Sequence, residues 1–99
     1  MRHIRARWPD AVVPPGEPEW LLYELDEAAD QVTRSVELFP GGRVQRNSIE
    51  IEERKGDSCP SLWDVSIIEG LEGLTPTEIS ASEFEGVWRT GIDAPFWYP

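Results

Sequence analysis

The chain has 99 residues, enough for one domain with a single hydrophobic core. Hydrophobic residues make up 39% of it and aromatic residues 10%, which indicates a folded rather than a disordered protein. Nine basic and nineteen acidic residues give a net charge of −10, which disfavours direct binding to nucleic acid or to an anionic membrane and favours a basic partner.

Cysteine content and hydropathy bear on the compartment. The single cysteine, Cys59, excludes an internal disulfide and fits a reducing environment. No apolar segment follows Met1, and no stretch of 18 apolar residues occurs, so neither a signal peptide nor a membrane span is expected. We therefore expect a cytoplasmic protein.

The first predicted element is a strand over residues 3–8, HIRARW. Its apolar residues alternate with a histidine and two arginines, so one face of the strand is basic and suits acidic side chains on a neighbouring strand. Residues 9–19 are rich in proline and are predicted to cross to the next strand as a stiff connector.

Residues 20–46 predict three strands in an antiparallel meander. WLLYEL (20–25) and QVTRSVELF (31–39) alternate in the period of a strand, and Gly41 and Gly42 supply a tight turn before the third strand. Short loops join neighbours, which makes the strands antiparallel in sequence order. The third strand is predicted to continue through SIEIEE (48–53), with a bulge at 46–48.

The pattern over residues 62–72 fits two kinds of element. Alternating apolar residues such as Trp63 and Val65 are typical of a strand, whereas the spacing of Val65, Ile68 and Leu71 is typical of a short helix. We prefer the helix.

The last helix has clear start signals. Ser80 and Glu83 form a capping box, and Ile79 and Phe84 occupy the positions of a hydrophobic staple. Gly91 is predicted to end the helix in the left-handed conformation.

The sequence also predicts the structure of the segments before and after this helix. TEIS (77–80) is predicted to approach the sheet as a short extended segment. The domain is taken as residues 1–90, and residues 91–99 as an aromatic C-terminal tail that either covers the open face of the sheet or forms part of a contact surface.

The sequence contains no constellation typical of catalysis or metal binding. His3 is the sole histidine, and Cys59 has no neighbouring base in the sequence, so neither a catalytic dyad nor a zinc site is indicated. Adjacent carboxylates such as Glu52 and Glu53 arise by chance in an acidic chain. We therefore expect no enzyme, cofactor or metal.

Three segments, LYELDE, VELFPGGR and EISASEFEGVW, together resemble a small family of uncharacterised bacterial domains. That family has a LYSELD-like strand, a VEVFxDGR-like hairpin and an EISxEFxxVW-like closing helix. The matching residues are Trp8, Pro18, Leu22, Tyr23, Glu24, Leu25, Asp26, Arg34, Val36, Glu37, Phe39, Gly42, Arg43, Glu78, Ile79, Ser80, Glu83, Phe84 and Trp88. The chain departs from the pattern in reading LLYELD and in its tail after Thr90. The resemblance implies the fold and a bacterial origin, and it carries over no activity.

These observations predict an α+β domain: an antiparallel β-meander of about four strands with a C-terminal helix, and with the helix at 62–72 as a second one, packed on one face. The leading hypothesis for function is a non-enzymatic acidic binding protein, an immunity-type inhibitor that covers a basic site on a bacterial toxin or nuclease. The candidate partner-binding residues are Trp20, Glu24, Asp26, Glu27, Trp97 and Tyr98. The alternative is a self-associating structural or accessory domain, and both a monomer and a weak homodimer are compatible with the sequence.

Overall fold

The computed structural model describes residues 1–9, 12–54, 66–67, 71 and 73–93. Over these residues the chain forms a six-stranded sheet in the order β5-β1-β2-β3-β4-β6. The strands are β1 (Arg2–Arg7), β2 (Trp20–Asp26), β3 (Gln31–Leu38), β4 (Val44–Ser48), β5 (Thr77–Glu78) and β6 (Ile92–Asp93). The helices are α1 (Ile49–Arg54) and α3 (Ala81–Trp88).

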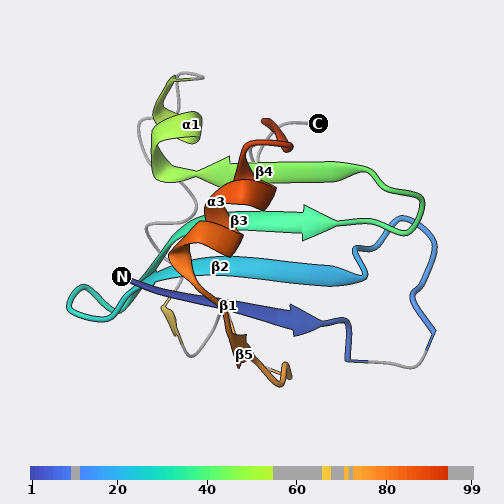
Figure 1. Cartoon of the computed structure of the whole chain (residues 1–99), viewed down its shortest axis with the longest axis horizontal. Helices are drawn as coiled ribbons and strands as arrows, with labels where there is room; N and C mark the ends of the chain where they lie inside the picture. The colour runs from blue at the N-terminus through green and yellow to red at the C-terminus, as the bar shows by residue number, and fades with distance from the viewer. Residues whose placement is uncertain (10–11, 55–65, 68–70, 72, 94–99) are drawn as a thin grey trace.

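The sheet is built on an antiparallel meander. Strands β1 to β4 pair in sequence order, with short turns joining β2 to β3 and β3 to β4 and a twelve-residue connection joining β1 to β2. Helix α3 crosses one face of them (Figure 1). β5 adds to the outer edge of β1, and β6 pairs in parallel with β4. The α+β class and the meander are confirmed. The described residues form six strands instead of about four, because the two short segments Thr77–Glu78 and Ile92–Asp93 join the two edges.

One predicted strand is wrong in its second half. β4 ends at Ser48, and the following residues form α1. The Ser48 hydroxyl accepts a hydrogen bond from the Ile51 N–H at 3.0 Å, which caps the first turn of the helix. Ile51 is buried, so this short helix covers part of the sheet edge.

The bulge also lies elsewhere than predicted. β3 and β4 pair without interruption, whereas the register between β2 and β3 shifts after Glu24. Glu24 lies opposite Arg34, and Leu25 lies opposite Val32, so Thr33 is the extra residue. The bulge therefore brings two β3 side chains to one position on β2.

The buried apolar residues form two clusters, one on each face of the sheet. The cluster under α3 consists of Leu22, Val36 and Phe84. The cluster on the opposite face consists of Ile4, Leu25 and Val32. A strand buried on both sides explains why the sequence of β2 is apolar at alternate and at neighbouring positions.

The N-terminal end of α3 agrees with the prediction from the sequence, and its C-terminal end does not. Ser80 is the N-cap and accepts from the Glu83 N–H at 3.0 Å, as predicted. Gly91, however, lacks the positive φ expected of it. A Cβ at this position would lie 3.0 Å from the Cβ of Arg46, so glycine is needed here for close approach to β4 and not for a left-handed turn.

Some of the predicted features lie outside the residues that the structure describes. The helix at 62–72 lies mostly outside the described residues, as do Cys59, Trp97 and Tyr98. At the start of the predicted tail 91–99, Ile92 and Asp93 form β6. In the described part of the chain, no helix has the length and apolar character needed to cross a membrane.

Candidate partner-binding surface

The candidate residues predicted on β2 do not form one surface. Trp20 begins the strand and Asp26 ends it, which places them about 20 Å apart at 3.3 Å per residue. Glu24 lies between them on the face that α3 covers. Each therefore has a different environment.

Glu24 belongs to a buried polar network. Its side chain is 12% exposed, and its carboxylate accepts hydrogen bonds from the Arg34 guanidinium and, at 2.7 Å, from the Thr33 hydroxyl. His3 Nε2 lies 3.1 Å from its second oxygen. The β3 bulge is what aims both Thr33 and Arg34 at this carboxylate. Partner binding by Glu24, as predicted from the sequence, would need an exposed carboxylate, whereas three donors and α3 enclose it.

Arg34 connects this network to α3. Its guanidinium also donates to Glu85, and its central carbon lies 4.9 Å from the ring centre of Phe84 and 4.8 Å from that of Trp88. His3 packs against Phe84 from the sheet, with ring centres 4.9 Å apart. The ion pairs and the cation–π contacts together hold the helix on the sheet.

The electrostatics of the network are those of a structural site. Burial alone would raise the pKa of Glu24, but the hydrogen bonds from Arg34, Thr33 and His3 outweigh it and lower the pKa to about 2. The hydrogen bond from Arg34 likewise lowers the pKa of Glu85. Both carboxylates are therefore held in the ionised form, and Glu24, which accepts from three donors, is unsuitable as a general acid or base.

A second group of carboxylates lies on the turn between β2 and β3, which projects beyond the end of the sheet (Figure 1). We call Asp26, Glu27 and Asp30 the acidic tip. Asp26 accepts from the Ala29 N–H at 3.2 Å, and Asp30 has a φ of 51°, a conformation that aspartate tolerates better than most residues. Glu27 and Asp30 are exposed and Asp26 is half-buried.

The acidic tip has little compensating charge. Arg2 lies 3.5 Å from Glu27 and 2.9 Å from Glu78 of β5, and the three side chains are 39%, 62% and 67% exposed. Such exposed pairs contribute little to stability. Within the described part of the chain, Asp26 and Asp30 make no ion pair. The tip and Glu78 thus present four carboxylates against one guanidinium.

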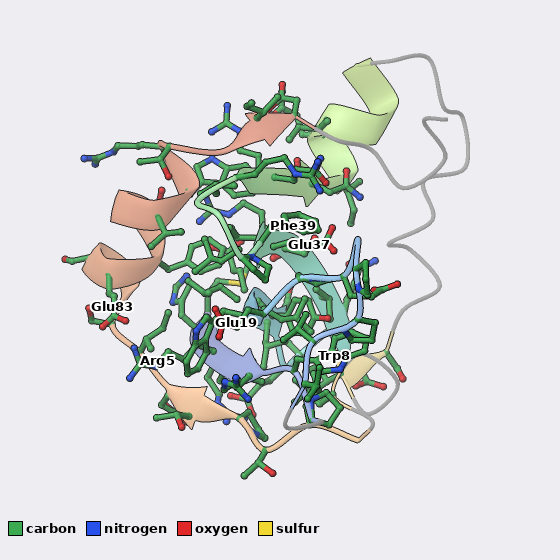
Figure 2. All side chains as sticks on the ribbon, turned by 90° about the vertical axis from the view of Figure 1, so that its right-hand side faces the viewer. Arg5, Trp8, Glu19, Glu37, Phe39 and Glu83 are labelled. Carbon is green, nitrogen blue, oxygen red and sulfur yellow. The ribbon has the colours of Figure 1, made fainter. Side chains whose placement is uncertain are left out.

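Trp20 lines a groove beside α3. This groove has a volume of about 310 Å³, and its apolar walls come from β2, β3 and α3. The Arg5 guanidinium lies 5.6 Å from the Trp20 ring centre and 3.5 Å from Glu83 (Figure 2). Trp20 is half-buried in the cluster under α3, so its ring is mainly part of the packing.

Two acidic residues of this region, one in the tip and one beside it, were not among the predicted residues. Asp30 was visible in the sequence, because it closes the DEAAD loop that contains Asp26 and Glu27. Glu78 gave no such signal, since its position depends on β5 joining the edge of β1. Among the described residues, no group of three or more histidine, cysteine or acidic side chains is arranged to hold a metal ion.

The fold and this surface define the class: a small α+β domain with a buried ionic network and an exposed acidic turn. The chain belongs to the family described as "Domain of unknown function (DUF6881)", whose model matches residues 2–93. The predicted resemblance to an uncharacterised domain family is confirmed, and the match extends beyond Thr90 through β6. No curated protein and no solved structure matches the chain.

Proposed function

We propose that this domain is a non-enzymatic binding protein that uses its acidic tip to contact a basic protein partner. The observation that carries the proposal is the projecting turn with Asp26, Glu27 and Asp30, near which Arg2 is the one guanidinium in the described structure. An immunity-type inhibitor that covers a basic site on a bacterial toxin or nuclease fits this chemistry.

The net charge supports the same function. The net charge of −10 over the whole chain, to which the protruding turn contributes three carboxylates, speeds the approach of a basic protein and repels nucleic acid. Turns held by a rigid sheet are also where binding residues are commonly found. An enzyme has weaker support, because Glu24, the described carboxylate with the largest shift in pKa, is locked in its ionised form by the network around it.

The test is a tip variant in which Asp26→Asn, Glu27→Gln and Asp30→Asn are combined. Asparagine at position 30 retains tolerance for the left-handed conformation. Immobilised wild-type protein should capture a basic protein from a bacterial extract, and the tip variant should lose it. With the captured partner in hand, the association rate should fall about tenfold at low salt and less at moderate salt.

A charge-matched control separates the tip from net charge. Glu19→Gln, Glu50→Gln and Glu83→Gln remove the same number of carboxylates elsewhere and should leave capture nearly unchanged. Equal losses in the two variants would contradict a specific role for the tip. Capture of nothing but the protein itself would favour the self-associating accessory domain instead.

A further inference from the structure

A separate cavity lies at the end of the sheet opposite the acidic tip. It has a volume of about 540 Å³ and opens between the proline-rich connector and the β3–β4 turn. Pro14, Pro15 and the ring of Phe39 give it apolar walls, and Glu17 and Arg43 contribute charged groups. The cavity therefore combines an apolar lining with charge, which is typical of a site for an amphipathic side chain.

A second carboxylate stands beside this lining. Glu37 lies near the end of β3, two residues before Phe39, so the extended backbone directs both side chains to the same side of the chain (Figure 2). Burial raises the pKa of Glu37, the charge of Glu17 raises it further, and Arg43 partly offsets both. In the described part of the chain neither glutamate makes an ion pair. The two carboxylates therefore repel each other next to the cavity.

Among the described residues that line the cavity, Arg43 carries the positive charge. Its guanidinium carbon lies 4.1 Å from the ring centre of Phe39, so it stacks on the aromatic face and makes no ion pair with Glu17 or Glu37 in the described structure. Two carboxylates thus face one guanidinium. The excess of negative charge favours an added cation.

We propose that this cavity binds a lysine side chain presented by a protein partner. The ammonium group lies between Glu17 and Glu37 and relieves their repulsion, while the four-carbon stem packs on Pro14 and Pro15. Lysine fits better than arginine, because Arg43 already occupies the stacking surface that a second guanidinium would use. The site lies at the other end of β2 and β3 from the acidic tip and does not depend on it.

The probe is lysine blocked at both ends, Nα-acetyl-lysine-N-methylamide, so that its side chain carries the sole charge. It is titrated into ¹⁵N-labelled full-length protein carrying the tip substitutions, which removes the other acidic site. We expect the amide signals of Glu17, Phe39 and Gly41 to shift as the probe is added and to reach a plateau at high probe concentration. The uncharged norleucine analogue should bind at least fivefold more weakly, and the arginine analogue more weakly than lysine.

Two variants decide the role of charge. Glu17→Gln with Glu37→Gln, nearly isosteric changes, should reduce lysine binding at least fivefold with an unchanged circular dichroism spectrum. Arg43→Gln removes the competing cation and should strengthen binding several-fold. Equal binding of lysine and norleucine, or no shifts at the cavity, would overturn the proposal. Binding that occurs in Arg43→Gln alone would also overturn it, because Arg43 would then be the resident cation. The probe contains no protein partner, so these outcomes leave the role of the acidic tip to its own test.

Discussion

Glu24 and Asp26 lie two positions apart on one strand, yet the two carboxylates have different surroundings. Glu24 lies beneath α3 and is enclosed by Arg34, Thr33 and His3. Its negative charge is compensated by these partners and stabilises the fold. Asp26 stands at the start of a projecting turn whose carboxylates are mostly without counter-ions. Glu24 is therefore held inside the fold, whereas the turn exposes Glu27 and Asp30, and we propose that this exposed charge is what a partner contacts.

The largest expected effect comes from the ring that covers the buried network. Phe84 is fully buried, and Phe84→Ala removes its contacts with His3, Arg34 and Trp88. The variant should lose about 4 kcal/mol of unfolding free energy in urea. The tip variant, measured alongside, should change by less than about 0.5 kcal/mol. Similar losses in both would remove the distinction between the two regions.

Breaking the ion pair should have the next largest effect. Arg34→Met leaves Glu24 and Glu85 without their shared cation and should cost about 3 kcal/mol, measured by urea denaturation. Combining it with Glu24→Gln removes the buried uncompensated charge, so the double variant should recover part of the loss. If the double variant is less stable than Arg34→Met alone, the charge of Glu24 is not what Arg34 compensates.

Acid should weaken the buried region more than the tip. Glu24 has a pKa near 4.5 when unpaired and about 2 in the fold, so its contribution is complete above about pH 5 and is lost as the pH falls toward 2. The pKa difference corresponds to at most about 3 kcal/mol, and we expect about 2 kcal/mol for a side chain that water still reaches. Glu24→Gln should flatten the loss of stability over this range, and an unchanged slope would contradict the assignment.

Glu37 should change the pH dependence of stability in the opposite direction from Glu24, and by a smaller amount. Its pKa is raised in the fold, so its ionised form is disfavoured there and stability declines as the pH rises through its titration. Glu37→Gln should therefore increase the unfolding free energy at pH 7 and leave it nearly unchanged at pH 4. A decrease at pH 7 would show that the carboxylate is compensated.

The sequence predicted those elements whose signals are local. The alternation in residues 20–25 and 31–39 and the Ser80 cap need no knowledge of distant residues. The helix α1 was missed because the apolar residues of SIEIEE recur at every second position, which is also the strand period. Gly91 was misread because its packing against Arg46 is a long-range contact.

The candidate surface was predictable to the same extent. Asp26 and Glu27 stand in a polar turn, and the sequence was sufficient to place them there. The burial of Glu24 was not predictable, because it depends on Arg34, 10 positions away, which in turn binds Glu85 of α3, 51 positions from Arg34. A glutamate that alternates with apolar residues in a strand is ordinarily assigned to the solvent-exposed face of the sheet. Here α3 covers that face, so the side chain of Glu24 is mostly shielded from solvent.

The most direct test of the account is the association rate of the captured basic partner with wild type, the tip variant and the charge-matched control, measured at low and moderate salt. We expect the tip variant to associate about tenfold more slowly at low salt, while the control stays close to wild type. Equal rates for the tip variant and wild type would contradict the claim that the exposed carboxylates of the β2–β3 turn form the binding surface.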